Sequence, residues 1–322
     1  MGMLVRGRWT EDDGDSRGSG GRFDHLPTKF RNFVTADGGS GFKAEPGRYY
    51  LYCSRTCPWA HRTVLLRYLK GLEEVVGLVW NVQRGTEGVT AAEQLPHTVP
   101  GTDVQINHLH ELYTLANPDY TGRVTVPTLW DAKRRTVVNN ESAEIVRMLN
   151  AEFPAFANND IDYYPESLRS QIDAVNELVY HAINNGVYKA GFSTSQAAYD
   201  EAYARLFAAL DELERRLGRS RYLCGNAITE ADWRLFPTLF RFDSVYHYAF
   251  KCNLRHLYQY PNLWGYCRDL YQQPGIAGRC FLDAAKRGYW SNPRVNPTGT
   301  IPNGPELDFD APHDRERFRR AA

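Results

Sequence analysis

The chain has 322 residues, enough for one large domain or two ordinary domains with a substantial core. Lysine plus arginine and aspartate plus glutamate both total 38, so no global charge attracts nucleic acid or an acidic membrane. No apolar run reaches the roughly 18 residues of a membrane helix, and the N-terminal residues have no signal-peptide core. We therefore expect a cytoplasmic protein with neither a nucleic-acid nor a membrane partner.

The first half of the chain predicts an α/β unit. Residues 1–46 are rich in Gly, Asp and Arg and predict an extended arm, and a compact unit follows over 47–152. In chain order we expect a strand at 48–53, a helix at 58–70, a strand at 75–82, a short helix near 106–116, strands at 124–130 and 135–138, and a helix at 141–150. Strand-helix-strand, then a hairpin and a helix, is the order of a thioredoxin-like fold.

Cys57 sits at the first strand-to-helix junction of this unit. It precedes Pro58, and proline is well tolerated in the first turn of a helix. We therefore expect Cys57 at or next to a helix N-cap, where unpaired amides and the helix dipole stabilise a thiolate. Such a position lowers the pKa of a thiol from about 8.5 to roughly 3.5–7.5. The pattern predicts a nucleophilic sulfur, and a buried cysteine at an ordinary helix start is the alternative.

The six cysteines do not form a metal-binding pattern. No Cys-x-x-Cys pair occurs, so a zinc site is unsupported and we expect no metal. A disulfide scaffold is not expected in a long chain without a signal peptide. Cys53 stands four residues before Cys57, so two hypotheses remain for it: a disulfide with Cys57, or a buried thiol.

Long amphipathic helices characterise residues 165–290. Over 196–217, apolar residues recur at three- and four-residue spacing, with a capping box at Ser193 and Gln196 and a stop at Gly218. Further helices are expected at 231–245, after the capping signature that begins at Thr229, and at 263–272 and 276–287. Residues 291–322 form the predicted C-terminal tail. A thioredoxin-like domain followed by an all-α domain is similar to the layout of the glutathione transferase fold.

Seven segments, in register, resemble the glutathionyl-hydroquinone reductases, the Xi class of the glutathione transferase superfamily. They begin at residues 30, 57, 122, 140, 184, 229 and 296, and read FRNFVTADG, CPWAHR, GRVTVP, NESAEI, NNGVYKAG, TEAD and NPTG. The resemblance implies that the Cys57 thiolate attacks the sulfur of a glutathionyl-hydroquinone and that a second glutathione resolves the mixed disulfide. Ala60 stands where a dithiol oxidoreductase has its second cysteine, which fits a monothiol cycle. The resemblance also implies a homodimer.

The resemblance implies a set of thiol-binding residues. Val126 and Pro127 match a cis-proline turn, in which the backbone of the preceding residue pairs with the cysteinyl part of glutathione. Ser142 and the helix amides would hold the γ-glutamyl carboxylate, while Glu141 would pair with its ammonium. Simple helix capping is the alternative for Glu141 and Ser142. Arg123 is assigned to the same set.

Two tyrosines match positions that, in this family, point at the substrate ring. A phenol at Tyr188 or Tyr289 would hydrogen-bond or protonate the developing charge on the hydroquinone. The chain also departs from the family: Val89 stands where a tryptophan lies on glutathione, and Cys53 and Arg55 stand where apolar residues are common. Glutathione and another low-molecular-weight thiol therefore both remain candidates for the thiol.

The sequence leaves two alternative functions open. One is an omega-like thioltransferase or dehydroascorbate reductase that uses the same Cys57. The other is a non-catalytic, transferase-like binding module, although such a module has no need of a poised thiolate.

Overall fold

The computed structural model describes residues 2–11, 17–82 and 84–318. These residues form two compact units. The thioredoxin-like unit contains residues 2–11, 26–82 and 84–162, and the helical unit contains 17–25 and 163–318. Residues 12–16 of the predicted arm and 319–322 of the predicted tail lie outside the described residues, and the division into arm, two domains and tail stays a prediction.

The thioredoxin-like unit combines short strands with three helices. Its strands are β1 (Met3–Val5), β2 (Arg8–Thr10), β5 (Tyr49–Ser54), β6 (Val76–Asn81), β7 (Arg84–Gly85), β8 (Gly88–Val89), β9 (His97–Thr98), β10 (Gln105–Ile106), β11 (Gly122–Arg123), β12 (Thr128–Asp131) and β13 (Thr136–Asn139). Its helices are α1 (Pro58–Leu69), α2 (Leu109–Ala116) and α3 (Ser142–Ala151).

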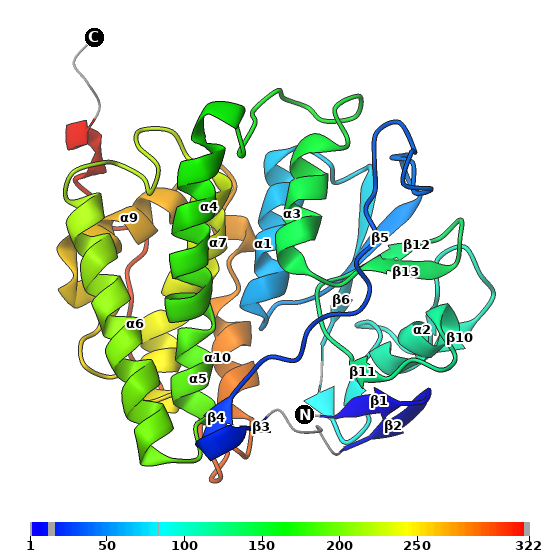
Figure 1. Cartoon of the computed structure of the whole chain (residues 1–322), viewed down its shortest axis with the longest axis horizontal. Helices are drawn as coiled ribbons and strands as arrows, with labels where there is room; N and C mark the ends of the chain where they lie inside the picture. Colours follow the sequence, from blue (N-terminus) through cyan, green and yellow to red (C-terminus); the bar gives the residue numbers. More distant parts are fainter. Residues whose placement is uncertain (1, 12–16, 83, 319–322) are drawn as a thin grey trace. The chain divides into compact units, whose positions relative to one another are not determined.

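The central sheet has the strand order β13-β12-β5-β6 (Figure 1). β5 runs parallel to β6, and β12 runs antiparallel to both β5 and β13. Side chains alternate along a strand: Cys53 lies against Thr63 of α1, whereas Tyr52 joins a buried cluster with Leu109 and Tyr113 of α2. The two helices therefore cover opposite faces of the sheet, and α3 packs beside α1. The predicted thioredoxin-like fold is confirmed.

The first residues of the predicted arm form a hairpin, so the arm is not simply extended. β1 pairs with both β2 and β11, with Met3 opposite Arg123 and Leu4 opposite Gly122. Leu4 is fully buried in the same cluster as α2. Apolar burial at one position, together with backbone pairing on both sides of β1, holds this segment to the thioredoxin-like unit.

The helical unit contains the remaining elements. They are β3 (Arg17–Gly18), β4 (Arg22–Phe23), α4 (Arg169–Leu178), α5 (Gly186–Phe192), α6 (Gln196–Leu217), α7 (Glu230–Arg241), α8 (His247–Ala249), α9 (Pro261–Tyr271) and α10 (Leu282–Trp290). Two π-helical turns, η3 (Val179–Asn184) and η4 (Phe242–Tyr246), interrupt the α-helical pattern. Short 3₁₀ turns are η1 (Ser19–Gly21), η2 (Glu166–Leu168), η5 (Leu257–Gln259), η6 (Ala277–Arg279) and η7 (Arg315–Phe318).

The long helix α6 has the predicted bounds and the predicted C-cap at Gly218. Its N-cap differs from the prediction. Ser195, not Ser193, accepts a hydrogen bond from the Ala198 amide at 3.3 Å. Ser193 instead ends α5, where its hydroxyl donates to the carbonyl of Lys189. The capping box that begins at Thr229 is confirmed.

Three other predicted elements were partly wrong. The strand predicted at 124–130 begins at Thr128, because Pro127 has no N–H to donate to a sheet. The helix predicted at 276–287 is divided: Cys280 has extended backbone angles (φ −104°, ψ 107°) and separates η6 from α10. The helix predicted at 231–245 changes from α to π geometry after Arg241.

A buried arginine attaches the C-terminal segment to the end of α6. Arg315 is fully buried, and its guanidinium donates to the carbonyls of Leu217 (2.9 Å), Ser220 (2.5 Å) and Arg221 (2.7 Å). The last carbonyls of a helix have no partner within the helix. Arg315 therefore satisfies the carbonyl of Leu217, the last residue of α6, and two carbonyls of the segment that follows the helix.

We expect Arg315→Ala to lower the free energy of unfolding by about 2–4 kcal/mol, because several buried acceptors lose a charged donor at once. Urea unfolding of the full chain measures this change. Arg317→Ala is the matched control, since the Arg317 side chain is 46% exposed and an exposed ion pair contributes at most about 1 kcal/mol. Equal loss in the two variants would contradict the capping role.

Candidate functional site

Cys57 occupies the junction between β5 and α1. It is the N-cap residue of α1, with extended backbone angles (φ −79°, ψ 122°), and Pro58 follows in the first turn. The Cys57 carbonyl accepts the amide of His61 at 3.0 Å, which begins the helix. The side chain is half-buried. The predicted location of this cysteine at a helix N-terminus is confirmed.

The Cys57 sulfur lies beside the backbone of Val126. Its Sγ is 3.5 Å from the Val126 carbonyl oxygen, and the Val126–Pro127 peptide bond is cis, as the resemblance implied. β12 begins just after this turn and pairs with β5, with Thr128 opposite Tyr52. Strand pairing thus brings together two segments that are separated by 69 residues in sequence.

Glu141 and Ser142 lie at the N-terminus of α3. Glu141 is the N-cap residue, and its carboxylate accepts the Ala143 amide at 3.3 Å. This hydrogen bond is the helix-capping contact that was the predicted alternative to thiol binding for Glu141. Ser142 is buried, and its hydroxyl accepts a hydrogen bond from the Arg62 guanidinium at 3.4 Å.

Arg62 was not among the predicted thiol-binding residues. It lies on α1, is 2% exposed, and stacks over the Trp59 ring with its guanidinium carbon 4.5 Å from the centroid. It connects the helix that begins at Cys57 to the helix that begins at Ser142. Arg62 follows Cys57 by five residues, about one and a half helical turns. This spacing was the sequence signal that could have placed it near the thiol site. Arg123 lies in β11 opposite Met3, three residues before Val126, and its predicted role in thiol binding stays a prediction.

The other five cysteines lie in surroundings that disfavour a thiolate. Cys53 is fully buried with its sulfur 3.7 Å from the Thr63 hydroxyl, and burial raises the pKa of its thiol to about 12. Burial likewise raises the pKa of Cys224 to about 11 and of Cys280 to about 12, and raises the pKa of Cys252 and Cys267 further. Cys53 thus matches the buried-thiol hypothesis.

Tyr188 and Tyr289 meet within the helical unit. Their hydroxyls are joined by a short hydrogen bond, although the residues are 101 positions apart in sequence. The Tyr246 hydroxyl is 3.4 Å from that of Tyr289, and its ring meets the Tyr289 ring edge-on at 5.6 Å. Phe250 contacts all three rings at 5.3–5.6 Å. The prediction had named the pair but not Tyr246 or Phe250.

Gly191 makes room for this aromatic cluster. A Cβ at this position of α5 would stand 2.3 Å from the Phe250 ring, closer than packed atoms approach. Phe192, the next residue, packs against Phe250 at 5.0 Å and against Phe23 of β4 at 5.2 Å. The cluster therefore depends on close approach between α5 and the residues that follow α8.

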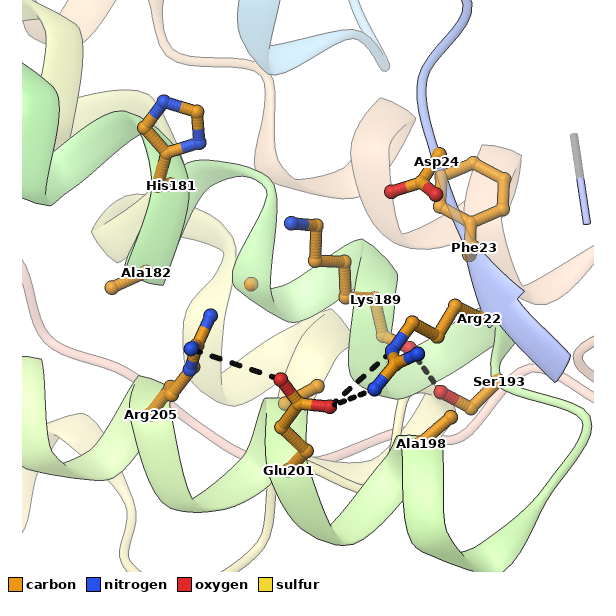
Figure 2. Close-up of a pocket in the computed structure, with 12 residues that line it drawn as sticks. Arg22, Phe23, Asp24, His181, Ala182, Lys189, Ser193, Ala198, Glu201 and Arg205 are labelled. Atoms are coloured by element: carbon orange, nitrogen blue, oxygen red, sulfur yellow. Dashed lines mark hydrogen bonds and ion pairs between the residues drawn. The ribbon is translucent and has the colours of Figure 1, made fainter. Parts of the chain in front are cut away.

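A separate pocket, lined by both charged and apolar residues, lies among β4, η3, α5 and α6 (Figure 2). Arg22 meets the Glu201 carboxylate at 2.7 Å, and Arg205 approaches the same carboxylate at 3.8 Å. Nearby, the Ser195 hydroxyl donates to the Gly20 carbonyl at 2.6 Å. These contacts attach residues 20–24 to the first turns of α6.

Among the described residues, no group of three or more His, Cys, Asp or Glu side chains is placed to hold a metal ion. Within the same ranges, no helix combines the length and the apolar character needed to cross a membrane.

We expect one rapid alkylation by iodoacetamide in the folded protein at neutral pH, on Cys57. Raised pKa values keep the other five thiols protonated, and a protonated thiol is a poor nucleophile. Peptide mass spectrometry identifies the labelled residue. Comparable labelling of Cys53, or a 53–57 linked peptide after mild peroxide, would contradict the buried environment of Cys53.

Comparisons with known proteins identify the families to which the two halves of the chain are similar. Residues 56–152 match the glutathione S-transferase N-terminal domain family, and residues 196–269 match the C-terminal domain family. The chain is 48% identical to the glutathionyl-hydroquinone reductase YqjG of Escherichia coli, over 98% of this chain and 99% of that protein. It is 45% identical to the glutathionyl-hydroquinone reductase PcpF of Sphingobium chlorophenolicum, over 95% and 96%.

Solved structures give the same assignment. A Xi-class transferase from Natrialba magadii superposes with a TM-score of 0.88 at 44% identity, with 98% of this chain and 97% of that chain covered. The glutathione-bound structure of E. coli YqjG superposes with a TM-score of 0.86 at 46% identity, over 98% and 99%. The chain belongs to the glutathione transferase superfamily, in the family of the Xi-class glutathionyl-hydroquinone reductases.

Proposed function

We propose that this protein is a thiol-dependent reductase that removes glutathione from glutathionyl-hydroquinones, with Cys57 as the nucleophile. One observation carries the proposal: a half-buried thiol at the N-cap of α1, beside the Val126 carbonyl, in a chain that matches glutathionyl-hydroquinone reductases along nearly its whole length. The amides at a helix N-terminus favour the anionic form of the nucleophile and of the leaving sulfur.

The reaction has two steps. In the first, the Cys57 thiolate attacks the glutathionyl sulfur of the substrate in its keto tautomer. The sulfur–carbon bond breaks, its electron pair passes through the ring carbon to the neighbouring carbonyl as an enolate, and protonation of the enolate oxygen gives the free hydroquinone. In the second, a glutathione thiolate attacks the glutathionyl sulfur of the mixed disulfide and releases the Cys57 thiolate. The net change consumes one glutathione and forms glutathione disulfide and hydroquinone.

The residues that we assign to thiol binding lie on three segments of the chain. The backbone at Val126 is placed beside the Cys57 sulfur and is assigned to the cysteinyl part of glutathione. Ser142, at the N-terminus of α3, is assigned to the γ-glutamyl carboxylate, and the buried Arg62 adds a positive charge 3.4 Å from its hydroxyl. Glu141 and Arg123 complete the assignment. The glutathione-bound structure of a relative supports glutathione as the thiol.

The ring-binding side of the proposal rests on Tyr188 and Tyr289. Two phenols that share one hydrogen bond provide acidic O–H groups for a hydroquinone oxygen or for a developing carbanion. The homodimer and the cytoplasmic location implied by the sequence stay predictions, and light scattering of the purified protein tests the former.

We expect Cys57→Ser to abolish release of glutathione from glutathionyl-menadione, because an alcohol neither forms nor releases a mixed disulfide. Hydroquinone release, followed by chromatography with glutathione as the added thiol, measures the activity. Cys280→Ser, the other half-buried cysteine, is the matched control and should retain activity. Turnover of Cys57→Ser at the wild-type rate would overturn the assignment.

We expect Tyr188→Phe and Tyr289→Phe each to lower kcat on a glutathionyl-hydroquinone by roughly 100-fold, the usual loss for a missing acid or oxyanion donor. Exchange with a simple disulfide needs no carbon acid, so it should remain near wild type. Parallel assays of both substrates separate the two effects. Equal loss on both substrates would indicate damage to the fold and not a role at the ring.

A further inference from the structure

The helix that carries Tyr289 has little apolar burial of its own. Within α10, all of whose residues the structure describes, only Ala285 is buried. Apolar burial contributes about 25 cal/mol per Å², and the larger apolar side chains of α10, Leu282, Tyr289 and Trp290, are only half-buried. Polar contacts therefore contribute, together with ring packing, to the position of α10 and of the Tyr289 hydroxyl.

Lys286 of α10 donates to the carbonyls of Asn303 (2.6 Å) and Gly304 (2.8 Å). The polar contacts of α10 with η4 lie at its last turn, on two consecutive residues. The Trp290 indole N–H donates to the Ser244 carbonyl at 3.1 Å, in the π-helical turn η4. The Tyr289 hydroxyl bonds to that of Tyr188 and lies 3.4 Å from that of Tyr246, the last residue of η4. At 3.4 Å the contact with Tyr246 is longer than an ordinary O–H···O bond. The bond from Trp290 is thus the shorter and stronger of these two hydrogen bonds between α10 and η4.

The same turn is held from its C-terminal side. Asn296 is 9% exposed, and its side-chain amide donates to the Trp290 carbonyl at 2.8 Å and to the Thr300 carbonyl at 2.9 Å. Trp290 is therefore held through its side chain by η4 and through its backbone by Asn296. Consecutive residues of a helix point about 100° apart, so a rotation or slide that broke the Trp290 bond would also move the Tyr289 hydroxyl.

We propose that Trp290 is a positioning residue for the reductase reaction: its bond to the Ser244 carbonyl sets the register of α10 against η4, so that the hydroxyls of Tyr289 and Tyr188 meet. This inference rests on the proposed function, in which that pair serves the hydroquinone ring. Ser244 takes part through its backbone, so the link depends on the π-helical path of η4 and not on the Ser244 side chain. Trp290 acts through Tyr289 and does not itself touch the substrate.

The variant Trp290→Phe keeps a ring at this position and removes the N–H. We expect it to lower kcat on a glutathionyl-hydroquinone by about three- to ten-fold, the range expected for loss of one hydrogen bond. KM and simple disulfide exchange should change less than two-fold. Trp264→Phe is the matched control: Trp264 is half-buried in α9 of the same unit and packs on Phe309 at 5.1 Å. It should leave both activities at wild type.

A double-mutant cycle separates positioning from general stability. In a Tyr289→Phe background, Trp290→Phe should lower kcat no further, because the hydroxyl through which it acts is already gone. An equal loss in both backgrounds, or no loss in either, would overturn the inference. The proposed function fails separately: it fails if the wild-type protein does not release hydroquinone, or if Tyr289→Phe matches wild type.

Discussion

Pairing between β5 and β12 is the constraint on which the thiol site depends. β5 ends at Ser54, three residues before Cys57, and β12 begins immediately after Pro127, so the antiparallel ladder with Tyr52 opposite Thr128 determines where both loops leave the sheet. The sulfur then lies 3.5 Å from the Val126 carbonyl. A slip of one residue in this register would turn the side chains of β5 to the opposite face. The same pairing therefore keeps Cys53 beneath α1 and leaves Cys57 at the helix N-terminus.

The N-termini of two neighbouring helices create the electrostatic setting of this site. Cys57 is the N-cap residue of α1 and Glu141 is the N-cap residue of α3, and both helices present backbone amides at their first turns. Arg62 connects them by its contact with the Ser142 hydroxyl. In the folded chain Glu141 caps α3 with its own carboxylate. Capping and ligand binding are compatible for this residue, since a carboxylate has two oxygens and accepts several hydrogen bonds.

In the helical unit, three tyrosine hydroxyls come together inside a cluster of aromatic side chains. Buried phenols require partners, and Tyr188, Tyr246 and Tyr289 provide them for one another. Their rings surround Phe250, and Gly191 admits Phe250 against α5. The π-helical turn η4 ends at Tyr246 and offers the Ser244 carbonyl to α10. Insertions of this kind inside helices are frequent at functional sites.

Local patterns in the sequence determined where several helices of this protein begin and end. Pro58 after a strand-like run predicted the helix start at Cys57, and apolar spacing predicted α6 to the residue, because both depend on neighbouring side chains and backbone preference. The assignment of Tyr188 and Tyr289 to the substrate ring followed only from family resemblance, since twenty tyrosines leave no local signal to choose two. Tertiary structure alone decided the contact of Arg62 with Ser142, the division of the helix at Cys280 and the link from Trp290 to Ser244. These features depend on where distant segments pack, and packing between distant segments leaves no periodic trace in a single sequence.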